Sequence, residues 1–175
     1  MEKREISKKI CLLGDSSVGK TSLIRRYVYD MFSDQYIVTF GAKVSSKEMR
    51  LYTDDEEYDL SLAIWDIVGE HDRRFLQAAH YKGSSGALVV CDCTRKVTFD
   101  NIEDWVDALL QSASGAKIVF LLNKIDLKDR AAVGLDDYKY LISKYKADCH
   151  ETSAKTGENV EQAFKTLAEK MIFSK

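Results

Sequence analysis

A glycine-rich segment between an apolar run and a helical pattern constrains the fold of this chain more than any other feature. Residues 9–13 are mostly apolar, which is typical of a buried strand, and residues 22–29 continue as an amphipathic helix. The segment between them has the spacing G-x-x-x-x-G-K-[ST], filled by Gly14, Asp15, Ser16, Ser17, Val18, Gly19, Lys20 and Thr21. A strand, a tight loop and a helix in this order favour an α/β fold, in which ligands bind at the carboxyl ends of the strands.

This segment has the chemistry of a phosphate-binding loop. Its two glycines let the backbone N–H groups point inward, and the following helix presents its positive end to phosphate oxygens. We expect Lys20 to neutralise the β and γ phosphates and the Thr21 hydroxyl to ligate Mg²⁺, with Ser22 beside them in the site. The alternative is a Gly-Ser loop that only turns the chain, which the flanking strand and helix disfavour. The sequence therefore predicts a nucleoside polyphosphate ligand.

Apolar strands and amphipathic helices alternate along the rest of the chain. Alternation with a period of two at 44–52 and 58–65, around polar residues 53–57, predicts a hairpin. The nearly unbroken apolar runs 86–93 and 117–122 are typical of parallel strands covered on both faces. Helical spacing predicts two core-facing stripes, one made of Ile102, Trp105, Val106 and Leu109 and the other of Val160, Phe164, Leu167 and Met171. Together these patterns predict one doubly wound α/β domain over residues 1–175.

Composition excludes several classes of partner. The net charge of −2 and the pI near 6.0 provide no basic field, so nucleic acid is not an expected partner. Cys11, Cys91, Cys93 and Cys149 fall in predicted strands without a C-x-x-C pair, and we interpret them as small core residues in a reducing compartment. No apolar run, secretory signal or lipidation signal predicts a membrane anchor, so we expect a cytoplasmic protein. Peripheral membrane association is expected only if a lipidated tail or a partner lies outside this sequence.

Two later motifs indicate which nucleotide binds. Asp66 follows an apolar run, where its carboxylate can hold Mg²⁺ through water, and Gly69 can bring its N–H against the γ-phosphate. Asp126 ends the motif that begins with Asn123 and Lys124, and its carboxylate can accept from both N1–H and the exocyclic amine of guanine. Adenine lacks this pair of donors, so such a site discriminates between the bases. A later segment, Ser153, Ala154 and Lys155, places the Ala154 N–H where it can donate to the guanine O6.

With these motifs in this order, the whole chain resembles a Ras-superfamily small GTPase, and residues 14–21 and 65–66 resemble the Rab branch. The resemblance implies a P-loop NTPase G domain with a mostly parallel six-stranded sheet and one antiparallel edge strand. It implies a monomeric switch in signalling or vesicle trafficking that binds GTP and GDP with Mg²⁺ and hydrolyses GTP. It also implies effector, exchange-factor and GTPase-activating partners that contact residues 33–45 and 67–82.

The same resemblance implies roles for individual residues. Phe32 is expected to pack edge-on against guanine, Tyr36 to close over the phosphates, and Thr39 to bring its hydroxyl to Mg²⁺ when GTP is bound. The alternatives are an ordinary loop anchor for Phe32 and an exposed loop hydroxyl for Thr39. The implied metal ligands are then Thr21, Thr39 and Asp66, and the implied catalytic group is Lys20, Thr39, Gly69 and Glu70.

Glu70 departs from the family pattern, which has a glutamine that orients the attacking water. Glutamine donates and accepts hydrogen bonds, whereas ionised glutamate only accepts them. At about 4–5 Å and an effective dielectric of about 20, repulsion between this carboxylate and a phosphate is about 3–4 kcal/mol before Mg²⁺ and Lys20 offset it. We expect Glu70 to swing away or to slow hydrolysis, and we rank general-base catalysis by Glu70 or His71 lower. We interpret His71 as a solvated loop histidine and the arginines at 73 and 74 as a solvated face.

Three hypotheses for function follow. The first is a GTP/GDP switch with slow intrinsic turnover that depends on an activating partner. The second is a GTP-loaded interaction module with negligible hydrolysis. The third is another P-loop enzyme, such as a nucleotide kinase, which the motif at 123–126 disfavours because a kinase needs an acceptor site and an arginine-bearing lid instead.

Overall fold

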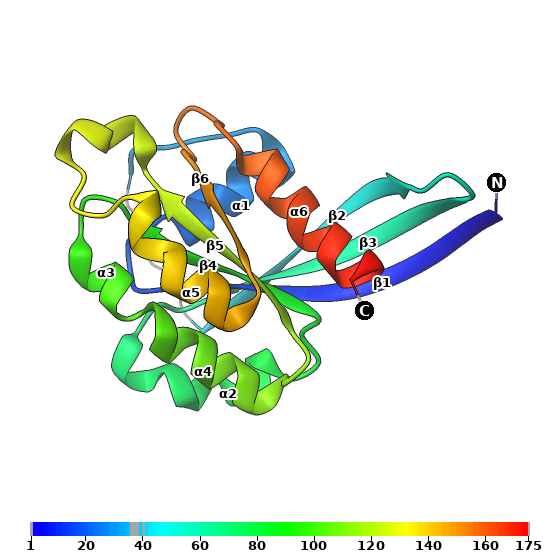
Figure 1. Ribbon diagram of the computed structural model, residues 1–175, viewed down its shortest axis with the longest axis horizontal. Helices are drawn as coiled ribbons and strands as arrows, with labels where there is room; N and C mark the ends of the chain where they lie inside the picture. The colour runs from blue at the N-terminus through cyan, green and yellow to red at the C-terminus, as the bar shows by residue number, and fades with distance from the viewer. Residues whose placement is uncertain (1, 36–38, 40, 175) are drawn as a thin grey trace.

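The computed structural model describes residues 2–35, 39 and 41–174. A six-stranded sheet in the order β2-β3-β1-β4-β5-β6 forms its centre (Figure 1). The strands are β1 (Glu2–Leu13), β2 (Ala42–Tyr52), β3 (Glu56–Ile67), β4 (Gly86–Asp92), β5 (Lys117–Asn123) and β6 (Asp148–Glu151). The edge strand β2 is antiparallel to β3, and the other neighbouring strands are parallel. The mostly parallel sheet with one antiparallel edge strand is therefore confirmed.

Helices connect the strands and cover both faces of the sheet. The α-helices are α1 (Lys20–Tyr29), α2 (Ala78–Tyr81), α3 (Lys96–Asp100), α4 (Ile102–Ser112), α5 (Lys139–Tyr145) and α6 (Val160–Phe173). The 3-10 helices are η1 (His71–Gln77), η2 (Ile125–Arg130) and η3 (Leu135–Tyr138). In the described part of the chain, no helix has the length and apolar character needed to cross a membrane.

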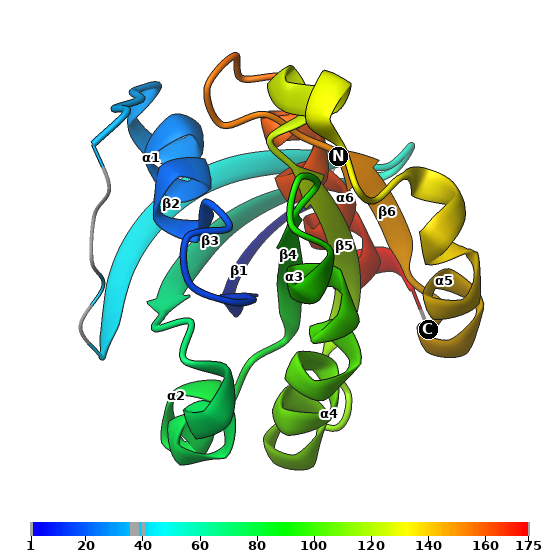
Figure 2. The ribbon, with the colours of Figure 1, turned by 90° about the vertical axis from the view of Figure 1, so that its left-hand side faces the viewer.

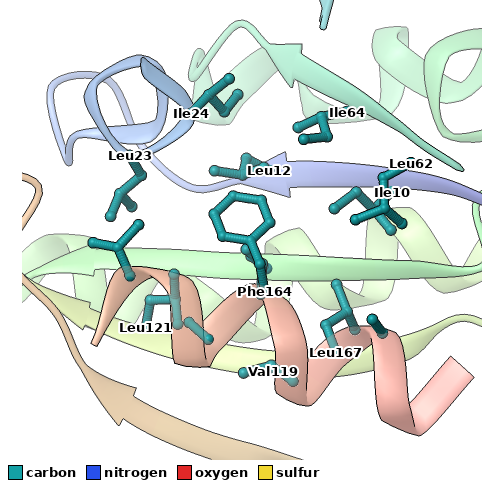
Figure 3. Packing of buried hydrophobic residues seen from close by; sticks show 14 of the residues in the cluster. Ile10, Leu12, Leu23, Ile24, Leu62, Ile64, Val119, Leu121, Phe164 and Leu167 are labelled. Atoms are coloured by element: carbon teal, nitrogen blue, oxygen red, sulfur yellow. The ribbon is translucent and has the colours of Figure 1, made fainter. Parts of the chain in front are cut away.

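Alternating side chains of the central strands divide the core into two clusters. Ile10 and Leu12 of β1 pack in one cluster with Phe164 of α6 and with residues of α1 (Figure 3). Cys11 and Leu13 belong to the other cluster, together with the buried residues of α4. In Figure 2, α2 and α4 lie together on the side of the sheet that this second cluster occupies. The period of two along β1 thus places helices on both faces, as a doubly wound domain requires.

The predicted apolar stripes lie where their spacing places them. Ile102, Trp105, Val106 and Leu109 are buried along α4, and Val160, Phe164 and Leu167 are buried along α6. Met171 is only partly buried at the edge of its cluster. All four cysteines are free thiols; Cys93 follows β4 rather than lying in it, and Cys149 is half-buried.

The first strand is longer than its apolar pattern predicts. It begins at Glu2 rather than at Lys9 and pairs with β3 along nearly its whole length, whereas it pairs with β4 only from Ile10 onward. Strands β1, β2 and β3 therefore project together beyond α6 (Figure 1). Charged side chains are tolerated in this projection because they remain partly exposed, and Lys3 forms an ion pair with Asp59 at 2.7 Å. Cross-strand pairing, rather than hydrophobic alternation, extends this strand.

Candidate nucleotide site

The predicted motifs meet at one cavity of about 680 Å³ near the carboxyl ends of the parallel strands. Of the predicted site residues, its lining includes Ser16, Ser17, Gly19, Lys20, Thr21, Ser22, Phe32, Thr39, Gly69, Glu70, Asn123, Lys124, Asp126, Ala154 and Lys155. Five others, Gly14, Asp15, Val18, Asp66 and Ser153, are not among the residues that line it. Tyr36 lies outside the described residues. Segments separated by more than 100 positions therefore contribute to one concave site.

The two glycines of the phosphate loop are required by close backbone packing. Gly14 has φ +140°, and a Cβ there would lie 2.3 Å from the carbonyl oxygen of Val90 in β4. Gly19 has φ +105°, and a Cβ there would lie 2.4 Å from Nδ2 of Asn123. A side chain at either position would clash and would also be strained at positive φ. The loop is thus pressed against β4 and against the end of β5.

Lys20 is folded onto the loop that precedes it. Its ammonium group donates to the carbonyl oxygens of Gly14 at 2.8 Å and Asp15 at 2.9 Å. Burial lowers the pKa of Lys20 to about 8, and the nearby carboxylates of Asp66 and Asp15 oppose that shift. A buried ammonium with this environment is stabilised by an added anionic ligand, such as a phosphate.

Gly69 lies directly against the phosphate loop. A Cβ at Gly69 would lie 2.6 Å from the Lys20 ammonium and 2.6 Å from the Ser16 nitrogen. The Ser16 hydroxyl donates to the Gly69 carbonyl oxygen at 3.0 Å. The segment that follows β3 is thereby fixed beside the lysine, at the end of the cavity that the phosphate loop forms.

Three oxygen-bearing side chains from separate segments converge beside Lys20. Thr21 Oγ1 lies 2.9 Å from Thr39 Oγ1 and donates to Asp66 Oδ2 at 2.5 Å, and Thr39 Oγ1 lies 3.5 Å from the same carboxylate oxygen. Burial raises the pKa of Asp66, while the hydrogen bond from Thr21 and the charge of Lys20 lower it. The second oxygen, Asp66 Oδ1, is buried and has no hydrogen-bond partner among the described residues. Hydroxyls and a partly unsatisfied carboxylate form a donor set that fits Mg²⁺ with retained waters.

Asn123 and Lys124 connect the phosphate loop to the other end of the cavity. Asn123 Nδ2 donates to the Val18 carbonyl oxygen at 2.9 Å, and its Oδ1 accepts from Thr152 Oγ1 at 3.0 Å. The Lys124 ammonium donates to the Ser17 carbonyl oxygen at 2.7 Å. These side chains hold the loop that contains Asp126 at a fixed distance from the loop that contains Lys20.

Asp126 is oriented by a neighbour that does not line the cavity. The hydroxyl of buried Ser153 donates to Asp126 Oδ1 at 2.7 Å, and the Thr156 N–H donates to Ser153 Oγ at 3.1 Å. The carboxylate is therefore held at the same end of the cavity as Ala154 and Lys155. This arrangement presents a carboxylate acceptor and a backbone segment together, which is the pairing expected for a guanine base.

The sequence patterns do not reveal the hydrogen bonds that residues 95–105 donate to the phosphate loop. The Asp15 carboxylate accepts from Nδ2 of Asn101 at 2.7 Å and from Nε1 of Trp105 at 2.8 Å. The Ser16 carbonyl oxygen accepts from the Arg95 guanidinium at 3.0 Å. Asn101 directly precedes α4 and Trp105 lies four positions later, so both side chains lie on the same side of the helix. In the sequence, only the spacing of four between polar Asn101 and Trp105 could have suggested that Trp105 also donates a hydrogen bond.

Two residues after Gly69, His71 and Arg74, are less exposed to solvent than the sequence predicts. Glu70 lines the cavity with its side chain 51% exposed, and it pairs with the Nε of exposed Arg73 at 3.3 Å. The interpretation of His71 as a solvated histidine is wrong, because its Nε2 lies 2.9 Å from Asp104 Oδ2 in α4. The interpretation of Arg74 is also wrong, since its side chain is mostly buried and donates to the His71 carbonyl oxygen at 2.8 Å. The 3-10 turn η1 folds these residues back onto α4.

Comparison with known proteins agrees with this geometry. The model of the Ras family matches residues 9–173. The Ras-related protein Rab-13 of Rattus norvegicus is 33% identical over 165 residues, which cover 94% of this chain and 79% of the relative. The Ras-related protein Rab7 of Drosophila melanogaster is 37% identical over 169 residues, covering 94% and 80%, and Rab-8B of Pongo abelii is 36% identical over 161 residues, covering 91% and 76%. The chain therefore belongs to the Ras family and has Rab proteins among its relatives.

Proposed function

We propose that this chain is a molecular switch that binds GTP and GDP with Mg²⁺ and hydrolyses GTP to GDP and phosphate. In this proposal residues 1–175 form a single G domain. The observation that supports it best is that one cavity joins the Lys20 loop, the Thr21 oxygen cluster and Asp126. A ligand that fills it must present several phosphate groups at one end and a hydrogen-bonding base at the other.

At the phosphate end, the chain supplies positive charge and oxygen ligands. The backbone of the phosphate loop, through Ser16, Ser17 and Gly19, would direct N–H groups at the phosphates, and Lys20 would neutralise part of their charge. Thr21 and Thr39 would hold Mg²⁺ through their hydroxyls and Asp66 would do so through water, and bound Mg²⁺ neutralises charge on the β and γ phosphates. Thr39 would bring its segment to the metal in the GTP state, and the Gly69 N–H would contact the γ-phosphate.

At the base end, the chain distinguishes guanine by paired polar groups. The Asp126 carboxylate accepts from N1–H and the exocyclic amine, and the Ala154 N–H donates to O6. Adenine would leave the carboxylate without donors, which costs the desolvation energy of a charged group. Phe32 lines the cavity and would pack against the edge of the base.

The hydrolytic step is expected to be slow without an activating partner. Glu70 can accept a hydrogen bond from water but cannot also donate one in its ionised form. His71 is a poor candidate for the general base because it is not among the residues that line the cavity and its Nε2 faces Asp104 in α4. Arg73 offsets part of the Glu70 charge at 3.3 Å, which favours the switch over the alternative, a GTP-loaded module with negligible hydrolysis. Activating, exchange and effector proteins would contact residues 33–45 and 67–82.

Single-turnover hydrolysis separates the two alternatives. The chain is loaded with γ-labelled GTP, free nucleotide is removed, and phosphate release is followed with Mg²⁺ present. A switch converts its bound GTP to GDP in one exponential phase, and Lys20→Ala abolishes that phase. Retention of intact GTP for as long as the protein remains folded would contradict the proposed switch and support the interaction module.

A further inference from the structure

Arg26 of α1 makes three polar contacts outside the nucleotide cavity. Its Nε donates to the Ala154 carbonyl oxygen at 2.9 Å, and its Nη2 donates to the Lys155 carbonyl oxygen at 2.6 Å. Its Nη1 pairs with Asp30 Oδ1 at 2.9 Å. The Arg26 side chain is 19% exposed, and Ala154 is 128 positions away in sequence. One planar guanidinium thus joins α1 to the loop that follows β6.

The two carbonyl groups belong to the backbone segment that lines the base end of the cavity. Ala154 and Lys155 lie outside any helix or strand, so their orientation depends on local turns and on side-chain partners. The turn itself is closed by the Gly157 N–H, which donates to the Ser153 carbonyl oxygen at 2.8 Å. Because each planar peptide unit joins a carbonyl group to the N–H of the next residue, the guanidinium also fixes the N–H groups of Lys155 and Thr156.

The third contact connects Arg26 with the segment that leads to Phe32. Asp30 directly follows α1 with φ +51°, and its N–H donates to the Arg26 carbonyl oxygen at 3.0 Å. Phe32, two residues further on, lines the same cavity as Ala154. Asp30 is 89% exposed, so its ion pair contributes little, and the two carbonyl contacts carry the restraint.

We propose that Arg26 is a positioning residue for base recognition, which holds the segment Ala154–Lys155 so that its backbone N–H groups, that of Lys155 most directly, stay aimed at the guanine O6. Loss of the guanidinium lets this backbone turn away, weakens the O6 contact and accelerates nucleotide release. The inference rests on the proposed guanine site. It adds a residue that lies outside the cavity and does not touch the nucleotide.

Dissociation of two diphosphates from the full chain tests this role. GDP presents an oxygen at position 6, whereas 6-thioguanosine diphosphate presents sulfur, a weaker acceptor that depends less on a well-aimed N–H. Arg26→Ala should release GDP about tenfold faster or more, as expected for losing charge-assisted hydrogen bonds, but should accelerate 6-thioguanosine diphosphate much less. Arg26→Lys keeps the positive charge but lacks the planar guanidinium with its several N–H donors. Its GDP release rate should lie between those of Arg26→Ala and the unaltered chain.

Arg25→Ala is the matched control, because Arg25 lies next to Arg26 and its side chain forms no hydrogen bond or ion pair with the residues that the structure describes. It should leave both release rates within about twofold of the unaltered chain, the scale of most surface substitutions. If thermal unfolding shows that Arg26→Ala is poorly folded, the release rates of Arg26→Lys serve for the same comparison. Unchanged GDP release, or equal acceleration of both diphosphates, would overturn the role of Arg26. If instead the unaltered chain bound ADP as tightly as GDP, the proposed guanine site itself would fail, and this inference with it.

Discussion

Replacing Glu70 with glutamine should accelerate GTP hydrolysis, because the carboxylate repels a phosphate and lacks a donor. At about 4–5 Å the repulsion is about 1 kcal/mol at a water-like dielectric and about 3–4 kcal/mol at a dielectric of about 20. The half-exposed side chain favours a value between these limits, and the exposed Arg73 partner removes about 0.2–1 kcal/mol. A net change of about 1–3 kcal/mol in the barrier remains, so we expect Glu70→Gln to raise the rate about tenfold.

The assay is single-turnover hydrolysis on chain preloaded with GTP, so that nucleotide exchange does not contribute. Arg73→Ala alone should slow hydrolysis a few-fold, since it removes the cation that offsets the Glu70 charge. In a chain that already carries Glu70→Gln, Arg73→Ala should have no effect on the rate. GDP affinity should barely change in either variant. Slower hydrolysis by Glu70→Gln, with a rate in the unaltered chain that falls as acid protonates the carboxylate, would refute the repulsion argument and identify a general base. An unchanged rate would show that Glu70 does not face the reacting phosphate.

Two further predictions concern the metal shell and the support of the phosphate loop. Thr21→Asn should weaken GTP binding more than GDP binding, while Lys20→Ala should weaken both. Chelation of Mg²⁺ should accelerate nucleotide release. Equal dissociation rates with and without a chelator would contradict the proposed metal shell. Trp105→Phe removes the indole donor to the buried Asp15 carboxylate at 2.8 Å and should cost about 2 kcal/mol of folding free energy, and urea unfolding that showed no loss would argue against this hydrogen bond.

Local patterns in the sequence predicted the buried strands and most of the residues that line the cavity, whereas the six-stranded sheet and its antiparallel edge were expected from the family resemblance. Apolar alternation and unbroken apolar runs follow from which faces of a strand are buried, so they identify strands such as 86–92 directly. The motifs around Lys20 and Asp126 are short and contiguous, and the strand before each of them fixes where it lies. Their shared position at the carboxyl ends of parallel strands then follows from the topology.

The sequence was insufficient where polar groups meet across long separations. The hydrogen bond from Trp105 to Asp15 joins residues 90 positions apart, and its distance and angle depend on how α4 packs rather than on any periodicity. The solvated interpretation of His71 failed for the same reason, since its partner Asp104 comes from another element. The charged start of β1 was missed because cross-strand pairing with β3, and not burial, keeps it extended.

The central claim is that the cavity selects a guanine nucleotide through Asp126. Its most direct test is an equilibrium titration in which GTP and ATP compete with labelled GDP, repeated with Asp126→Asn and with xanthosine triphosphate. GTP should compete at least about 10⁴-fold better than ATP, because a site built to pair polar groups rejects a base that lacks them. Asp126→Asn should shift the preference toward xanthosine triphosphate, whose 2-oxo group accepts from the amide. Comparable competition by ATP and GTP would contradict the account.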